Sequence, residues 1–299
     1  MDFAALLAQA KPSKLQTVAV AAAEDPVVLK TLVDAYREGI ANAILCGNEQ
    51  RIKEAAQSEG LDISPFSIIH TEDDKLSAVA AVSAVREGKA DMLMKGLLQT
   101  SILLKAVLNK ERGLRGSGLI SHVCVLYSPI LDRTLFLSDG GMVPYPDLPA
   151  KVKILENAVF AAKGMGVACP KVAVLAAVET INQDMPPTLD AAALTLMNRR
   201  GQIKGCVVDG PLAMDLALSP YAAEHKGVKS EVAGQADVLI FPNIESGNCA
   251  LKVFTCAGNG IFGGVVMGAA APIVLSSRGD SEQNKLYSIA CAAKIAMNS

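Results

Sequence analysis

An arginine flanked by serines lies near the end of this 299-residue chain, where a buried strand is followed by a helix. The apolar run at 272–275 predicts the strand, and the helical spacing of apolar residues from Leu286 onward predicts the helix. Ser277 and Arg278 therefore stand in a polar turn, beside the free N–H groups at the start of a helix. A guanidinium, hydroxyl groups and helix N–H groups together suit an anion such as phosphate.

Asp280 in the same turn has two possible roles. Its spacing from Gln283 is that of a capping box, in which the carboxylate only accepts N–H groups at the start of the helix. A carboxylate beside a phosphate site could instead act as a general base. We predict the catalytic role and keep the structural cap as the alternative.

A second polar turn follows a predicted strand at 91–94 and opens a helix expected to end at Asn109. Its small and polar members are Lys95, Gly96, Gln99, Thr100 and Ser101. A lysine and two hydroxyls at a strand-to-helix turn again suit an anion. The turn lacks the G-x-x-x-x-G-K-[ST] spacing of a P-loop, so a purely structural turn is the alternative.

The first part of the chain alternates between strand and helix patterns. Strands are predicted at 17–22, 40–46, 66–70 and 91–94. Asp25 and Pro26 predict the start of the first helix, because Pro is favoured at the first helical position. This alternation predicts a parallel sheet with helices on both faces.

The second part begins with two β-rich runs, 120–127 and 134–137, which we expect to be antiparallel strands. A Gly- and Pro-rich loop at 138–146 then predicts a crossing into a second lobe. The alternating elements after it are a helix at 150–163, a strand at 171–175, a helix at 188–198, a strand at 205–209, a helical stretch opened by Gly210 and Pro211, and a strand at 236–241.

We therefore predict a two-lobed α/β fold with mainly parallel sheets flanked by helices. The first lobe comprises residues 1–138 plus 268–299, and the second lobe, residues 139–267, is inserted into it. The insertion is a judgement about topology, since the last strand and helix, at 271–299, must return to a sheet.

Composition excludes several classes of function. The net charge is −2 with no long basic run, and the chain has no Trp and only 4% aromatic residues, so nucleic acid is not an expected partner. No apolar run reaches the ~18 residues of a membrane-spanning helix. Seven Cys are scattered without a C-x-x-C, and three His form no cluster, so we expect free thiols in the cytoplasm and no metal site.

Four segments, taken together and in this order, resemble the phosphate acetyltransferase/butyryltransferase family. They are K-G-L-L-Q-T-S at 95–101, F-L-S-D-G-G-M-V-P-Y-P at 136–146, F-P-N-I-E-S-G-N at 241–248 and S-R-G-D-S at 277–281. Each motif is weak alone, whereas the ordered set is specific and spans essentially the whole chain. The compact length and the S-D-G-G-M and S-R-x-D-S segments look most like the butyryl branch, because the acetyl branch tends to be longer.

The resemblance implies a fold, a reaction and partners. The fold is a pair of lobes related to the isocitrate/isopropylmalate dehydrogenase architecture, with an active-site cleft between them. The reaction is butanoyl-CoA + phosphate = CoA + butanoyl phosphate, with coenzyme A and phosphate as substrates and no tightly bound cofactor. The protein is expected to be a homodimer or a larger homo-oligomer, without nucleic acid or membrane as a partner.

The resemblance also implies site residues. Ser277 and Arg278 match the family's pair that holds the phosphoryl end, and Asp280 is our third catalytic residue. The substrate-binding residues that we expect are Lys95, Gly96, Gln99, Thr100, Ser101, Asp139, Asn243, Gly247 and Asn248.

One position departs from the acetyl branch. Asn284 stands where that branch has an Asp proposed to deprotonate the CoA thiol. Asp280, Glu282 or Glu245 could replace it, and a thiol with a pKa of ~8.5 needs only modest help to ionise. No nucleophile motif such as G-x-S-x-G is present, so we expect direct attack without a covalent enzyme intermediate.

Four alternatives are weighed against this reading. A phosphate acetyltransferase acting on acetyl-CoA would differ only in its pocket. A nicotinamide-dependent oxidoreductase of the same architecture would need a dinucleotide turn, and no G-x-G-x-x-G follows the first strand. An acid kinase would need ATP and a phosphate loop. A two-lobed solute-binding protein would need export, for which no signal sequence is recognised.

Overall fold

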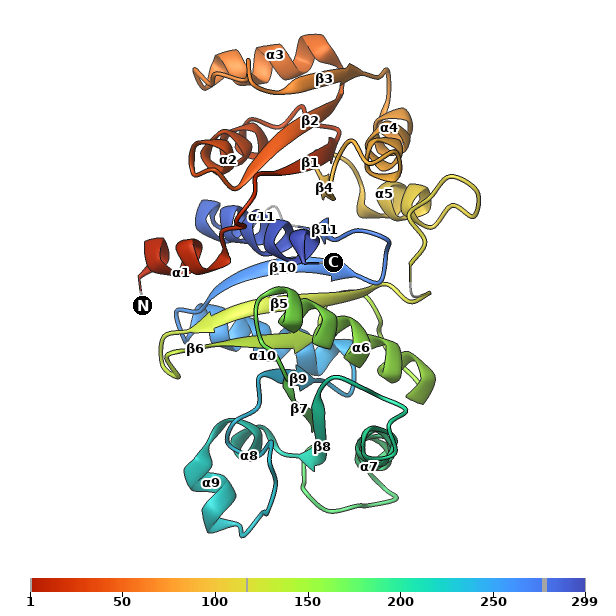
Figure 1. Cartoon of the computed structure of the whole chain (residues 1–299), viewed down its shortest axis with the longest axis vertical. Helices are drawn as coiled ribbons and strands as arrows, with labels where there is room; N and C mark the ends of the chain where they lie inside the picture. The colour runs from red at the N-terminus through yellow and green to blue at the C-terminus, as the bar shows by residue number, and fades with distance from the viewer. Residues whose placement is uncertain (1, 117, 276–278, 299) are drawn as a thin grey trace. The chain divides into compact units, whose positions relative to one another are not determined.

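The computed structural model describes residues 2–116, 118–275 and 279–298, so Ser277 and Arg278 lie outside the described residues. The chain forms two compact units: residues 1–118 with 262–299, and residues 119–261 (Figure 1). The chain thus leaves the first unit, builds the second and returns. Residues 119–138, which the predicted boundaries placed in the first lobe, belong to the second unit. The assignment of the units as functional lobes stays a prediction.

The first unit contains a mainly parallel sheet in the order β3-β2-β1-β4-β11-β10. The strands are β1 (Gln16–Ala21), β2 (Ala41–Gly47), β3 (Ser67–His70), β4 (Met92–Lys95), β10 (Ile261–Met267) and β11 (Ile273–Val274). β11 runs parallel to β4, and β10 runs antiparallel to β11. The predicted alternation of strands and helices is therefore confirmed here, and the last strand of the chain pairs beside β4.

Helices cover this sheet. They are α1 (Phe3–Ala10), α2 (Pro26–Arg37), α3 (Glu49–Ser58), α4 (Asp74–Arg86), α5 (Thr100–Val107) and α11 (Glu282–Met297). The carboxylate of Asp25 accepts the N–H of Val27 at 2.9 Å, with Pro26 as the first helical residue, which confirms the predicted start of α2. α2 packs beside α11, and α4 packs beside α5 (Figure 1).

The strands of the second unit pair in the order β5-β6-β9-β7-β8. The strands are β5 (Ser121–Ser128), β6 (Arg133–Ser138), β7 (Lys171–Leu175), β8 (Val207–Leu212) and β9 (Val238–Ile240). β5 and β6 form the predicted antiparallel pair, whereas β6, β9, β7 and β8 are mutually parallel. Because β6 pairs with β9, the β5–β6 hairpin is part of this sheet, which explains why residues 119–138 belong to the second unit.

The helices of the second unit follow the same pattern. They are α6 (Leu148–Gly164), α7 (Pro186–Arg199), α8 (Met214–Leu218), α9 (Pro220–His225) and α10 (Ile244–Cys256). The predicted helical stretch is present but begins at Met214 rather than at Gly210, because β8 continues through Gly210 and Pro211. The carbonyl oxygen of Leu212 accepts the N–H of Ala176 at 3.0 Å, so pairing within the sheet outweighs the local turn signal.

The observed fold is thus a mixed α/β fold with mainly parallel strands flanked by helices, as predicted. Each sheet is lined by fully buried aliphatic residues, such as Val18 and Val20 on β1 and Val172 on β7. Within the described ranges, no helix combines the length and the apolar character that crossing a membrane requires. The carboxyl ends of β4, β11, β6 and β9 are the points from which the four sequence motifs leave the sheets.

Candidate active site

Two of the four motifs leave the same edge of the sheet in the first unit. β4 and β11 are parallel and paired, with Leu93 opposite Ile273 and Met94 opposite Val274. The K-G-L-L-Q-T-S segment begins at the last residue of β4, and the S-R-G-D-S segment begins three residues after the last residue of β11 in the sequence. Parallel strands end at a common edge, and this is the edge where ligands bind in open α/β sheets.

Lys95 shapes the turn after β4. Its half-buried side chain donates hydrogen bonds to the carbonyl oxygens of Gly96 and Leu98, at 3.1 and 3.2 Å. Gly96 is buried against the end of β1, where a Cβ atom would overlap the carbonyl oxygen of Ala22. At this turn, where an anion site is predicted, the ammonium group of Lys95 is hydrogen-bonded to backbone carbonyls. The close packing against β1 requires a glycine at position 96.

Gln99, Thr100 and Ser101 are exposed at the start of α5. Gln99 occupies the N-cap position, and its side chain makes no capping hydrogen bond. The first N–H groups of a helix have no intrahelical partners, and α5 has no acidic residue in its first turn. Exposed hydroxyls beside such N–H groups are compatible with the predicted binding of an anionic group.

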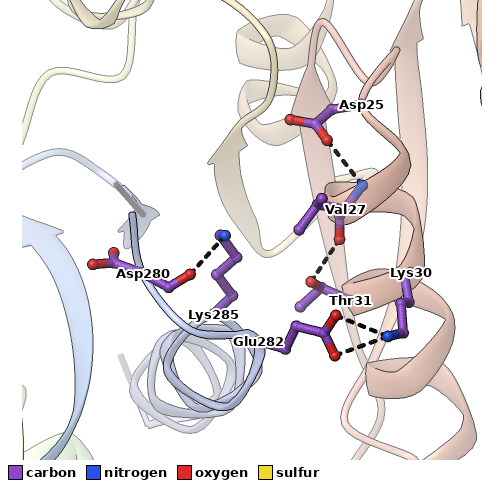
Figure 2. A network of polar contacts seen from close by, with 7 residues as sticks. All are labelled: Asp25, Val27, Lys30, Thr31, Asp280, Glu282 and Lys285. Atoms are coloured by element: carbon purple, nitrogen blue, oxygen red, sulfur yellow. Dashed lines mark hydrogen bonds and ion pairs between the residues drawn. The ribbon is translucent and has the colours of Figure 1, made fainter. Parts of the chain in front are cut away.

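The start of α11 differs from the sequence prediction. The N-cap is Ser281, whose hydroxyl oxygen accepts the N–H of Asn284 at 3.2 Å. The alternative role of Asp280 as the helix cap is therefore wrong, because the cap is the next residue. Asp280 is partly exposed, and its backbone carbonyl accepts a hydrogen bond from the ammonium group of Lys285 at 2.8 Å (Figure 2). Serine and aspartate are both good caps, and the register of the helix selects Ser281.

Asn284, at the position where the acetyl branch has an Asp, ties α11 to β10. Its side-chain oxygen accepts the N–H of Phe262 at 3.2 Å. One turn later the hydroxyl of Ser288 donates to the Asn284 carbonyl at 2.7 Å and accepts the N–H of Gly264 at 3.0 Å. The amide oxygen of Asn284 thus has a structural partner, which agrees with its exclusion as a base.

Two of the alternative carboxylates are engaged elsewhere. Both oxygens of Glu282 accept hydrogen bonds from Lys30 of α2 at 2.8 Å, in an exposed ion pair (Figure 2). Glu245 accepts a hydrogen bond from the hydroxyl of Tyr145, and this bond raises the pKa of Tyr145. The assignment of Asp280 as the base stays a prediction.

The other two motifs leave a common edge in the second unit. β6 and β9 are parallel, with Ser138 opposite Ile240, so the loops that follow them are neighbours. Asn243 is the N-cap of α10 and accepts the N–H of Ser246 at 3.0 Å. The side-chain amide of Asn248 donates to the carbonyl of Gly140 at 3.1 Å. The structure therefore brings the segment that begins at the predicted Asp139 into direct contact with the predicted Gly247 and Asn248.

Asp139 organises this loop. Its side chain is buried, and its two oxygens accept the backbone N–H groups of Gly141 at 2.7 Å, Met142 at 2.9 Å, Val143 at 3.3 Å and His122 at 3.1 Å. With four backbone N–H groups on its two oxygens, this carboxylate is directed into its own loop and away from solvent. The geometry favours an indirect role for Asp139, which holds the loop that carries its neighbours.

Gly247 allows the loop after β6 and the start of α10 to approach closely. A Cβ atom on Gly247 would come within 2.6 Å of the carbonyl oxygen of Asp139. The carbonyl of Pro144 also accepts the N–H of Ile244 at 3.0 Å. This packing explains why a glycine and two asparagines occur together in the F-P-N-I-E-S-G-N segment.

Two residues at these sites were missed by the sequence prediction. Lys285 is buried in the first turns of α11, and His122 presents its backbone N–H to Asp139. The sequence does offer a signal for Lys285. A cation is disfavoured near the positive end of the helix dipole, so a lysine at the start of a helix suggests a functional role. The role of His122 depends on its backbone and leaves no trace in the sequence.

No group of three or more His, Cys, Asp or Glu residues with the arrangement of a metal site occurs in the described part of the chain. No two cysteines among those residues form a disulfide.

Comparison with known proteins places these motifs in a family. The model of the family described as "Phosphate acetyl/butaryl transferase" matches residues 2–79 and 74–293. A phosphate butyryltransferase of Clostridium acetobutylicum is 48% identical over 297 residues, which cover 99% of this chain and 99% of that protein. A phosphate acetyltransferase of Thermotoga maritima is 41% identical over 290 residues, covering 97% of each chain.

A solved structure agrees with this placement. The crystal structure of a branched-chain phosphotransacylase from Enterococcus faecalis V583 superposes with a TM-score of 0.85 at 32% identity. The match covers 94% of this chain and 99% of that one. With motifs in the family's order and a match over nearly the whole chain, this protein belongs to the phosphate acetyl/butaryl transferase family.

Proposed function

We propose that this enzyme transfers a short acyl group between coenzyme A and inorganic phosphate, with butanoyl-CoA + phosphate = CoA + butanoyl phosphate as its reaction. One observation carries the proposal: all four family motifs follow the carboxyl ends of strands, as two neighbouring pairs, after β4 and β11 and after β6 and β9. The 48% identity to a phosphate butyryltransferase over almost the full length supports the same reaction.

The reaction needs few groups. In the direction of acyl phosphate formation, a phosphate oxygen attacks the thioester carbonyl carbon, the new C–O bond forms and the C–S bond breaks. Coenzyme A leaves as a thiolate, which then takes up a proton. A thiol pKa near ~8.5 makes this leaving group accessible, and in the reverse direction a weak base is enough to regenerate the thiolate.

We assign Arg278 and Ser277 to the phosphate, because a guanidinium can form two parallel hydrogen bonds to phosphate oxygens. Asp280, two residues later, exchanges the proton of the CoA thiol. Its side chain is not the helix cap, since Ser281 has that role, and this supports a function other than capping.

The remaining candidates are assigned to substrate binding. The hydroxyls of Thr100 and Ser101, with the free N–H groups of α5, suit anionic groups of the substrates, and Lys95, Gly96 and Gln99 shape and flank that turn. In the second unit, Asn243, Gly247 and Asn248 form the substrate-binding segment, and Asp139 acts indirectly by holding the loop beside it.

The acyl group is assigned as butanoyl rather than acetyl. The identity to the Clostridium acetobutylicum phosphate butyryltransferase is 48%, against 41% to the Thermotoga maritima phosphate acetyltransferase. A single methylene contributes only ~1–3 kcal/mol of discrimination, so both substrates should react at different rates. We extend the proposal to two lobes of the isocitrate/isopropylmalate dehydrogenase type, a homo-oligomer, a cytoplasmic location and no tightly bound cofactor.

The test is phosphate-dependent release of CoA from acetyl-, propanoyl-, butanoyl- and isobutanoyl-CoA, followed with a thiol reagent. We expect release that requires phosphate and a higher kcat/KM for butanoyl-CoA than for acetyl-CoA. Preference for acetyl-CoA would transfer the assignment to phosphate acetyltransferase. Absence of phosphate-dependent release from all four thioesters would reject the proposed reaction.

A further inference from the structure

A lysine is buried at the start of α11, close to the turn that carries the S-R-G-D-S motif. Lys285 is only 8% exposed and is the fourth residue of the helix. Its ammonium group donates a hydrogen bond to the carbonyl oxygen of Asp280 at 2.8 Å (Figure 2). The ammonium therefore lies beside a residue that follows Arg278 by two positions.

The positive charge of Lys285 has no anionic partner among the described residues. Its hydrogen-bond acceptor is a neutral carbonyl, and Figure 2 shows the Asp280 carboxylate pointing away from the ammonium. The nearest acidic residue on the helix, Glu282, directs both oxygens to Lys30. No ion pair observed within residues 2–116, 118–275 and 279–298 includes Lys285.

The position within the helix makes this charge more unusual. The start of a helix is the positive end of its dipole, where a cation is disfavoured and an anion is favoured. A buried ammonium is also disfavoured unless it is paired with an opposite charge. The two effects act in the same direction, and both are relieved when an anion binds at this end of α11.

We propose that Lys285 binds the phosphoryl group of phosphate and acyl phosphate. An ammonium group has three N–H donors, and the Asp280 carbonyl accepts one of them, which orients the others. This inference rests on the proposed function for the identity of the anion. The alternative is that Lys285 is only structural and holds the 279–281 turn through its hydrogen bond to the Asp280 carbonyl.

The two roles predict opposite effects on the stability of the ligand-free protein. If the charge of Lys285 is uncompensated, Lys285→Met raises the melting temperature without phosphate and abolishes the rise that phosphate produces in the wild type. If Lys285 is only structural, Lys285→Met lowers the melting temperature and leaves the phosphate-induced rise intact. Melting temperatures are measured with sodium phosphate and with sodium chloride at equal ionic strength.

Lys294→Met is the matched control. Lys294 lies on the same helix, and its ammonium donates to the carbonyl oxygen of Gln9, so the substitution removes a similar bond away from the motif. We expect this variant to keep the full phosphate-induced rise. A loss of the rise in both variants would overturn the proposal, because it would show an effect common to lysines of α11.

Steady-state kinetics give a second readout. Loss of a charged hydrogen bond to phosphate should raise the KM for phosphate at least about tenfold in Lys285→Met. The KM for butanoyl-CoA should stay within about twofold, since the thioester does not use this cation. A phosphate KM equal to that of the wild type would overturn the proposal. If Lys285→Met does not fold, Lys285→Gln is the neutral variant to which the same criteria apply.

The outcomes separate this inference from the proposed reaction, because the melting experiment contains no acyl-CoA. A phosphate-induced rise that depends on Lys285, in a protein that does not turn over any of the thioesters, would keep the site and reject the reaction. Turnover of butanoyl-CoA with an unchanged phosphate KM in the lysine variants would keep the reaction and reject the role of Lys285.

Discussion

The side-chain amide of Asn248 donates a hydrogen bond to the carbonyl oxygen of Gly140, 3.1 Å away, and so joins α10 to the loop that follows β6. The contact is possible because Gly247 lies directly against the same loop. These residues belong to motifs separated by about a hundred positions in the sequence, and the parallel pairing of β6 with β9 brings them together.

Gly247→Ala should therefore disturb the loop. The new Cβ atom would lie 2.6 Å from the carbonyl oxygen of Asp139, so the backbone must shift, at a cost of about 1–3 kcal/mol in the free energy of unfolding. Urea unfolding measures this cost. Gly279→Ala is the control, because apart from its chain neighbours a Cβ atom there meets no atom of the described residues within 4 Å. Equal unfolding midpoints for Gly247→Ala and the wild type would contradict the prediction.

Arg278→Lys should impair phosphate binding without affecting the fold. Lysine keeps the charge but cannot form the paired hydrogen bonds of a guanidinium, so we expect kcat/KM for phosphate to fall by about tenfold or more. Arg199→Lys is the control, since Arg199 is an exposed residue whose guanidinium lies 4.0 Å from the Asp209 carboxylate. The prediction fails if the phosphate KM and the turnover of Arg278→Lys match those of the wild type.

Asp280→Asn should remove the proposed base. We expect kcat to fall by about 10² at neutral pH and to recover towards high pH, where more of the CoA thiol ionises unaided. The measurement is a pH profile of kcat in the direction that consumes CoA.

Ser281→Ala is the control for this variant, because it removes the hydroxyl cap of α11 instead. Loss of that cap should cost ~1 kcal/mol of stability with little loss of rate. A kcat for Asp280→Asn that equals the wild-type value across the pH range would leave the base unassigned.

Alkaline pH should destabilise the protein through its buried thiols. Burial raises the pKa of the Cys46 thiol to about 12 and that of the Cys291 thiol also to about 12. In the unfolded chain a thiol has a pKa of ~8.5, so between about pH 9 and pH 12 the unfolded state loses a proton that the folded state keeps. The free energy of unfolding therefore falls as pH rises through this window.

Cys46→Ala tests this contribution. Urea unfolding at pH 8.5 and at pH 10.5 should show a smaller loss of stability in the variant, by about 2–3 kcal/mol, because one buried thiol no longer titrates. Cys169→Ala, which replaces an exposed thiol, should keep the full loss. The same pH dependence of stability in both variants would argue against a contribution from the buried Cys46 thiol.

Local sequence patterns predicted the elements whose signals are strong. The Asp25-Pro26 start of α2 and the antiparallel β5–β6 pair are both present, since caps and alternating apolar runs act within a few residues. Gly210 and Pro211 were misassigned because pairing of β8 with β7 is a long-range contact. α1 was missed because its packing partner, α11, lies at the other end of the chain.

The candidate site was predicted in part. The order of the motifs identified the candidate loops. The structure adds that the strands before them are paired, β4 with β11 and β6 with β9. The buried acceptor role of Asp139 depends on burial and hydrogen-bond partners, which residue types alone do not reveal. The same holds for Lys285, which has no anionic partner within the described ranges. The register of α11 also decided between Asp280 and Ser281 as the cap, although both are suitable residues.

The insertion of the second unit also bears on protein synthesis. β4 ends at Lys95, whereas its partner β11 begins at Ile273, after the whole of residues 119–261 has been made. At ~5–20 residues per second, β4 waits on the order of ten seconds or more for that partner, with an unpaired edge during this time. The later unit can thus complete its strand pairing on the ribosome before the earlier one, and the first unit closes only after β11 has been made.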